Sequence, residues 1–283
     1  MFSSVESLLS AAQDKPLWQA VLEDDCQDRQ ATQEDSLSRM GHRWQAMRQS
    51  VLDYDPTCRS ASGLSGGQGV RMASLANSIC GPFIQEVIGV ALKMGEHNAC
   101  MGRIVAAPTA GACGVVPATL IPLQRKDRLS DDLMVECLYV AAGFGQVIAS
   151  RASISGAEGG CQAEIGSAPG MAAAALVHAR GGTPEQMSAA CAMALQNVLG
   201  LVCDPVAGLV EVPCIKRNVM GAMNAMACAD MALAGLADGI PCDEVIDAMG
   251  AVGRVIPTSL RETGEGGLAA TPTGRRLATG GRE

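Results

Sequence analysis

The pattern of hydrophobic and polar positions predicts helices along most of the chain. Within residues 1–54, the segments VESLLSAAQ, PLWQAVLEDD and SLSRMGHRWQAMRQSVLDY place apolar residues three and four positions apart, as one face of an α-helix requires. Strand-like alternation is weak throughout, and no internal repeat is evident. The pattern therefore predicts an all-α protein, with residues 1–60 as a helical lead-in that continues into a domain over residues 61–283.

Glycine and proline divide the rest of the chain into segments. SASGLSGGQGV, residues 60–70, is too rich in glycine for a helix interior. It predicts a mobile loop or a backbone that encloses another group. It lacks the Gly-Lys-Ser/Thr ending of a phosphate loop, so it predicts no nucleotide site. The expected helices after it are 74–95, 131–153, 170–182 and 183–203, whereas APTAGACGVVPATLIP (107–122) is expected to be an irregular break.

Composition supports helices packed on small residues and excludes two classes of protein. Hydrophobic residues make up 48% of the chain but aromatic residues only 2%, so Ala, Val, Leu, Ile, Met and Gly must fill the core. A net charge of -8 argues against a nucleic-acid partner, which would need a basic face. The uncharged run 104–124 contains three prolines and the run 186–203 contains four polar residues, so neither predicts a membrane span.

The 12 cysteines would indicate disulfides in a small secreted protein. The N-terminus has no basic start followed by an apolar stretch and a cleavage site, so the expected location is the cytoplasm, with reduced thiols. Cys137, Cys191 and Cys228 lie on alanine-rich helices and are expected to be small core residues.

Other cysteines lie in segments rich in glycine or proline. Cys161 lies in SGAEGGCQAEIGSA, Cys203 in LVCDPVAG and Cys214 in EVPCIKRN, with Cys113 of PTAGACG as a rival. Cysteine thiolates are the usual ligands of iron-sulfur clusters, and glycine lets backbone amides approach the sulfur atoms. The separations of 42 residues between Cys161 and Cys203 and 11 between Cys203 and Cys214 match no familiar ferredoxin or zinc pattern. Spacing alone therefore leaves both a cluster site and buried core thiols open.

The residues around these cysteines resemble one family. ISGAEGGCQAEIGSA, CDPVAGLVEVPCIKRN, GRIVAAPTAGACGVVPA and LRETGEGGLAATPTG look like the α chain, or catalytic domain, of the iron-sulfur-dependent bacterial L-serine dehydratases. The resemblance runs in order from about residue 60 to the end. It implies an all-helical domain that holds a [4Fe-4S] cluster through the three matching cysteines, which are Cys161, Cys203 and Cys214.

The same resemblance implies the reaction, in which L-serine loses water to give aminoacrylate, whose imine tautomer hydrolyses to pyruvate and ammonia. With three protein ligands, one iron of the cluster stays open and can act as a Lewis acid on the substrate hydroxyl. Thr109, Ala110 and Gly111 are expected beside the substrate, offering a hydroxyl and backbone amides to its carboxylate. Lys216 and Asn218, with Arg217 between them, are expected to anchor a carboxylate or the charge of the cluster, although a solvated basic turn remains open.

Pyridoxal phosphate is the competing cofactor for this chemistry, and the sequence argues against it. Of the four lysines, Lys15, Lys93 and Lys126 lie outside the site-like segments, and no glycine-rich phosphate cup adjoins a separate Schiff-base lysine.

No histidine is a convincing general base. His42 and His97 are expected at the surface, and His178 at a helix end. In the family, a Ser-rich stretch ending in His-Thr on a separate β chain or fused β domain contributes to substrate binding and catalysis, and no such stretch occurs here. A β chain and an oligomeric assembly are therefore expected partners.

Three other functions remain open at the level of sequence. A related lyase acting on L-cysteine or L-threonine would carry the same motifs. An iron-sulfur redox sensor would supply a fourth protein ligand, and a helical scaffold would simply bury its thiols.

Overall fold

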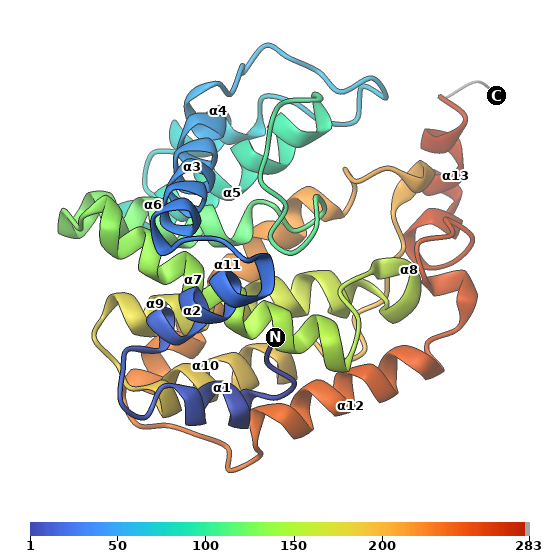
Figure 1. Ribbon diagram of the computed structural model, residues 1–283. Helices are drawn as coiled ribbons and strands as arrows, with labels where there is room; N and C mark the ends of the chain where they lie inside the picture. Colours follow the sequence, from blue (N-terminus) through green and yellow to red (C-terminus); the bar gives the residue numbers. More distant parts are fainter. Residues whose placement is uncertain (281–283) are drawn as a thin grey trace.

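A computed structural model describes residues 1–280 and confirms the all-α fold, because no β-strand occurs in that range. The α-helices are α1 (Val5–Ala11), α2 (Leu17–Arg29), α3 (Gln33–Leu52), α4 (Gln68–Ala73), α5 (Gly81–Ala99), α6 (Val115–Asp127), α7 (Asp131–Arg151), α8 (Gly156–Gly159), α9 (Ser167–Ala179), α10 (Pro184–Gln196), α11 (Cys214–Leu233), α12 (Cys242–Val255) and α13 (Pro272–Ala278). In Figure 1, α4 and α5 lie at the top, α12 runs along the bottom and α13 stands at the right.

Helix α9 is the centre of the core. Every residue from Ser167 to Val177 is buried, and α7, α10 and α11 pack around the helix. Four consecutive alanines, residues 172–175, present only methyl groups to these neighbours, which lets the helices approach closely. The core is thus built from small side chains, as the composition predicts.

The lead-in packs directly onto the rest of the molecule. Helices α2 and α3 both contact α7, and the buried indole of Trp44 on α3 donates from Nε1 to Oδ1 of Asp131 at 3.0 Å. Gln124 and Arg48 also donate to this carboxylate. The hydrogen bond from Gln124, followed by that from Trp44, lowers the pKa of Asp131 below its usual range.

Replacing Asp131 with asparagine should therefore make stability less sensitive to acid. A carboxyl whose folded-state pKa is lowered contributes stability above its unfolded pKa of about 3.9 and loses it as pH falls through the folded value. The Asp131→Asn variant should be less stable than the wild type at neutral pH, and the difference should shrink below about pH 4. Urea unfolding of the metal-free protein measures this, with the exposed neighbour Asp132→Asn as the control. A difference that stays constant over that range would contradict the prediction.

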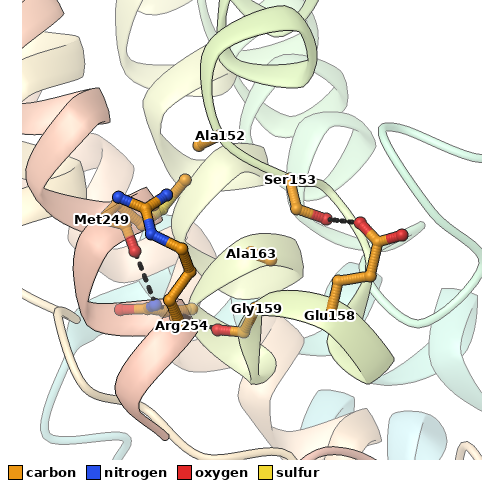
Figure 2. A pocket seen from close by; sticks show the side chains of 10 residues that line it. Ala152, Ser153, Glu158, Gly159, Ala163, Met249 and Arg254 are labelled. Carbon is orange, nitrogen blue, oxygen red and sulfur yellow. Dashed lines mark hydrogen bonds between the residues drawn. The ribbon is translucent and has the colours of Figure 1, made fainter.

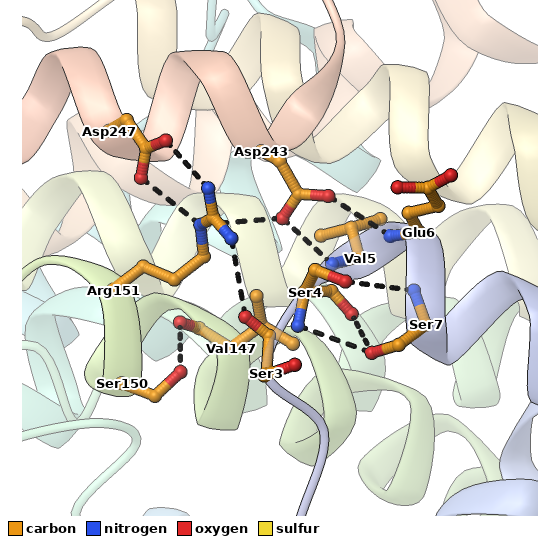
Figure 3. Close-up of polar contacts among 10 residues, drawn as sticks. All are labelled: Ser3, Ser4, Val5, Glu6, Ser7, Val147, Ser150, Arg151, Asp243 and Asp247. Carbon is orange, nitrogen blue, oxygen red and sulfur yellow. Dashed lines mark hydrogen bonds and ion pairs between the residues drawn. The ribbon is translucent and has the colours of Figure 1, made fainter.

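Polar contacts also connect α1, α7 and α12 (Figure 3). Asp243, on α12, accepts hydrogen bonds from the backbone amides of Val5 at 2.8 Å and Glu6 at 3.0 Å, at the start of α1. Arg151, on α7, donates from Nη2 to Oδ2 of Asp247 at 2.6 Å. These contacts hold α1, α7 and α12 together on one side of the core.

Several helix boundaries differ from the sequence-based expectation. The helix expected over 74–95 begins only at Gly81. The positive φ of Gly81, 71°, marks a break between this helix and the residues before it. The break expected over 107–122 instead contains α6 from residue 115, because Pro117 lies in the first turn, where no amide partner is needed. The helix expected over 183–203 begins as predicted, with Thr183 as N-cap in a capping box, but ends at Gln196.

Helix α7 is the one helix of residues 1–280 whose length and apolar composition would allow it to cross a membrane. Its apolar stretch is 61% buried inside the fold, as expected of a core helix.

Candidate functional site

The segment around Cys161 is mostly helical, which corrects the expected glycine-rich turn. Helix α8 ends at Gly159, Gly160 breaks the helical path with a φ of 76°, and Cys161 leads through a π-helical turn (Gln162–Gly166) into α9. A Cβ atom at Gly160 would lie 2.8 Å from Cδ1 of Ile256 and 3.0 Å from the carbonyl oxygen of Leu201. Glycine is required at this one position so that Cys161 can turn into the interior.

The buried side chain of Gln162 holds this turn in place. Its Nε2 donates to the carbonyl oxygens of Gly159 and Met249, both at 2.9 Å, and its Oε1 accepts from the amide of Gly200 at 2.8 Å. Figure 2 shows the contact at Met249 beside a cavity of about 180 Å³ that adjoins the turn on the side of α12. Three segments distant in sequence therefore meet at the residue after Cys161.

Cys203 is held by the C-terminal part of the chain. Its amide donates to the carbonyl oxygen of Leu260 at 2.9 Å, and its own carbonyl oxygen accepts from the amide of Glu262 at 2.8 Å. This is the only isolated β-bridge in residues 1–280. The motif LRETGEGG thus has a structural task, which is to fix the backbone on both sides of Cys203.

Cys214 is the first residue of α11, so the segment EVPCIKRN enters a helix at this cysteine. The carbonyl oxygen of Pro213 accepts from the amides of Lys216 at 3.0 Å and Arg217 at 3.1 Å. The side chain of Lys216 is exposed and has no ion-pair partner within residues 1–280. Its predicted role as an anchor stays a prediction.

The thiols of Cys161, Cys203 and Cys214 lie close enough to influence one another. The mutual influence of the two thiols lowers the pKa of Cys161 and raises the pKa of Cys203. Burial, followed by the charge of Cys161, raises the pKa of Cys214 to about 12.

Arg217 supplies positive charge to these thiols. After the influence of Cys203, the positive charge of Arg217 also lowers the pKa of Cys161. Its guanidinium is fixed by donation from Nη2 to Oδ1 of the buried Asp204 at 2.8 Å and from Nη1 to the carbonyl oxygen of Val202 at 2.9 Å. A fixed cation beside several thiols favours the thiolate state that metal ligation needs.

The PTAG segment faces the Cys161 turn. Thr109 donates from Oγ1 to Oε1 of Glu164 at 2.6 Å, and a Cβ atom at Gly111 would lie 3.1 Å from the same oxygen. A Cβ atom at Gly156 would lie 2.9 Å from both Sγ of Cys203 and Oε2 of Glu164. The absence of side chains at these glycines leaves space between the carboxyl group and the thiols. Burial raises the pKa of Glu164 above its usual range, which favours the protonated form of this carboxyl group.

Asn218 joins the PTAG segment to α11. Its Oδ1 accepts from the amide of Gly114 at 2.8 Å, and its Nδ2 donates to the carbonyl oxygens of Gly111 at 2.8 Å and Cys214 at 3.0 Å. The side chain is buried, with these atoms engaged inside the protein. The substrate contact predicted for Asn218 stays a prediction, but the structure gives it a clear positioning task.

A second group of thiols gathers in the core. Cys191, Cys228 and Cys242 are all buried. The neighbouring thiol of Cys242, followed by burial, raises the pKa of Cys191, and no cation contributes a lowering effect there. Electrostatics therefore distinguishes the two groups and favours ligation only at the site beside Arg217. Neither group is arranged to hold a single ion, since residues 1–280 contain no such set of three His, Cys, Asp or Glu side chains.

The histidines lie outside both groups. His178, in the last turn of α9, accepts or donates a hydrogen bond with Oε2 of Glu136 at 3.1 Å, as expected of a helix-end residue. His97 lies in the last turn of α5 with its ring against Gly102, and His42 is exposed on α3.

Comparison with known proteins identifies the family. A family model described as serine dehydratase alpha chain matches residues 12–269. The chain belongs to this family. The probable L-serine dehydratase, alpha chain, of Bacillus subtilis is 50% identical over 282 residues, which cover 98% of this chain and 94% of that protein. The L-serine dehydratase, alpha chain, of Peptoniphilus asaccharolyticus is 49% identical over 72% of this chain and 70% of its own length.

Longer proteins also match this chain. L-serine dehydratase 1 of Escherichia coli is 45% identical over 181 residues, which cover 63% of this chain but only 40% of that protein.

The sequence analysis assigned no role to three acidic residues close to the candidate ligands. Glu164 lies three residues after Cys161, Asp204 directly follows Cys203, and Glu211 lies three residues before Cys214. The available signal was their rarity, because each is a charged residue in an otherwise apolar or glycine-rich segment, and such residues are seldom buried without a partner.

Proposed function

We propose that this chain is the α chain of an L-serine dehydratase, a lyase that converts L-serine to pyruvate and ammonia. The names of its relatives support this activity, since the similarity to the Bacillus subtilis alpha chain extends over nearly the full length of both proteins.

The cofactor we infer is a [4Fe-4S] cluster held by Cys161, Cys203 and Cys214, without pyridoxal phosphate. The observation that carries this inference is the gathering of three thiols beside the fixed guanidinium of Arg217. The donor set fits, because the usual ligands of such clusters are cysteine thiolates. When bound, such a cluster with an open iron supplies a Lewis acid that polarises the C–O bond of the substrate.

The residues of the chain itself have distinct tasks in this proposal. Arg217 favours the thiolate form of Cys161 and offsets the negative charge of the cluster. Thr109 and the backbone amides near Gly111 bind the substrate carboxylate, while the hydroxyl of Thr109 also orients Glu164. Glu164, held at the edge of the space left by Gly156, can hold a proton next to the substrate. Lys216 remains a candidate anchor at the rim because it is exposed.

The active enzyme requires a second polypeptide, in our proposal a β chain with a Ser-rich His-Thr segment. Support comes from the longer relatives. The matched region makes up only 40% of their length, so these proteins contain additional sequence. We also propose that the lead-in and the remaining described residues form one continuous domain, because one hydrophobic core runs from Val5 to Met249. Residues 281–283 lie outside the described residues. The 12 free cysteines favour a reducing, cytoplasmic location.

Pyruvate formation tests the proposed function. Protein loaded with iron and sulfide without oxygen, and mixed with its partner chain, should form pyruvate from L-serine. L-cysteine and L-threonine supplied at equal concentration should react more slowly. Faster turnover of either competitor would transfer the assignment to a related lyase, and no turnover of any of them by cluster-loaded protein would favour a redox sensor.

Exposure to air should inactivate the assembled enzyme. An iron without a protein ligand is open to oxygen, so activity should decline as iron is released and should return after treatment with ferrous iron and a reductant. Iron content and pyruvate formation, followed in parallel samples, measure this. Undiminished activity in protein stripped of iron would contradict the proposed role of the cluster.

A further inference from the structure

Glu211 is a buried acid whose carboxylate is surrounded by serine hydroxyls. Ser60 and Ser65 donate from Oγ to Oε2 of Glu211 at 2.7 and 2.6 Å, and Ser62 donates to Oε1 at 2.9 Å. Glu211 is 6% exposed, Ser60 5% and Ser65 3%. Three charge-assisted hydrogen bonds thus join the glycine-rich loop of residues 60–67 to the segment just before α11.

This carboxylate has no ion-pair partner within residues 1–280. Burying an acid without a cation is costly unless donors satisfy its oxygens, and here the hydroxyls of one loop do so. The loop is ordered in return, since Ser60 and Ser65 also bond to each other, with the amide of Ser60 donating to the carbonyl oxygen of Ser65 at 3.1 Å. A fold that needed only a closed loop could use an uncharged residue at position 211.

The backbone of Glu211 leads directly to Cys214. Its carbonyl oxygen accepts from the amide of Ile215 at 3.0 Å, in the first turn of α11. The side chain therefore holds the loop and the main chain holds the helix start, with Cys214 between these two attachments. On the other side, Asn218 bonds to the carbonyl oxygen of Cys214 at 3.0 Å.

We propose that Glu211, through its serine partners, is a positioning residue that sets the place of the Cys214 sulfur at the cluster. This inference rests on the proposed cluster site. In this proposal the glycine-rich loop holds the side chain of Glu211 in place. Loss of the hydrogen bonds between the serines and Glu211 would let the start of α11 shift and would loosen the Cys214 ligand.

A second buried acid provides a matched control. Glu96, on α5, is 1% exposed and accepts from the backbone amides of Gly66 at 3.1 Å, Gln68 at 2.9 Å and Gly69 at 3.0 Å, and from the hydroxyl of Tyr54 at 2.6 Å. It holds the same loop, but its hydrogen bonds go to residues 54 and 66–69 and not to the segment before Cys214. Its loss should destabilise the loop without displacing the ligand.

The test compares the variants Glu211→Gln, Ser65→Ala and Glu96→Gln in full-length chains loaded with cluster without oxygen. Release of iron to a ferrous chelator should be about 10- to 100-fold faster in Glu211→Gln and faster than wild type in Ser65→Ala, since changes around metal ligands typically have effects of this size. The electron paramagnetic resonance spectrum of the reduced cluster should change in both. Glu96→Gln should lower the melting temperature but keep the wild-type spectrum and rate of iron release.

The outcomes separate this inference from the proposed function. Wild-type release rates and spectra in Glu211→Gln and Ser65→Ala would overturn the positioning role while leaving the cluster assignment intact. An equal acceleration in Glu96→Gln would also overturn it, because the effect would then follow loop stability alone. If Glu211→Gln does not fold, Ser65→Ala decides, as it removes one hydroxyl from the same carboxylate. A wild-type chain that binds no cluster would instead refute the proposed function and this inference with it.

Discussion

Alanine at Cys161, Cys203 or Cys214 should abolish the brown iron-sulfur chromophore and all serine dehydration. Each substitution would leave only two thiolate ligands for the cluster. It would also remove a thiolate near the guanidinium of Arg217, which is hydrogen-bonded to Asp204. Anaerobic purification followed by absorbance and by iron and sulfide analysis measures the loss. We expect little bound iron in any of the three variants and pyruvate formation at background level.

Cys191→Ala is the matched control for these three substitutions. Cys191 is buried and lies near other cysteines, as Cys161 does, but no cation lowers the pKa of its thiol. This variant should keep its full iron content and colour, with at most a loss of stability from the cavity it creates. A colourless Cys191→Ala protein, together with coloured variants at the other three positions, would move the cluster to the core group of thiols.

The isolated chain should bind cluster but turn over serine slowly or not at all, and addition of its partner chain should restore activity. Loss of a general base typically lowers the rate by about 10² to 10⁴, and loss of substrate-positioning groups adds to this. Steady-state pyruvate formation with and without the partner, at matched iron content, measures the effect. His97→Ala in the assembled enzyme should keep most of the activity, because His97 lies against Gly102 at the end of α5.

Full activity of the isolated chain would contradict this requirement for a partner and place the base on this chain. Glu164 would then be the first residue to replace, since it is a half-buried carboxyl group with a raised pKa beside Thr109. Loss of turnover in His97→Ala with the cluster intact would point to His97 instead.

Local sequence patterns were most informative where the interaction itself is local. The capping box at Thr183 involves residues three positions apart, and the predicted helix begins there in the structure. Prolines were misleading at 107–122, because whether a proline breaks a helix or starts one depends on which residue is the first of the helix. Pro117 falls in the first turn of α6, and even Pro122 is accommodated within that helix, where burial offsets the lost hydrogen bond.

By itself, the sequence determined the all-α class, the small-residue core and, through its motifs, the family to which the chain belongs. Only the tertiary structure decided which thiols meet and in what electrostatic surroundings. Cys161 and Cys203 are 42 residues apart, and their thiols influence one another because Gly160, Gln162 and the C-terminal bridge bring three segments together. The burial of Glu164 and Glu211 was likewise beyond sequence patterns. Helix periodicity records which face of an element is apolar, whereas the pKa of a group depends on charges and burial supplied by residues distant along the chain.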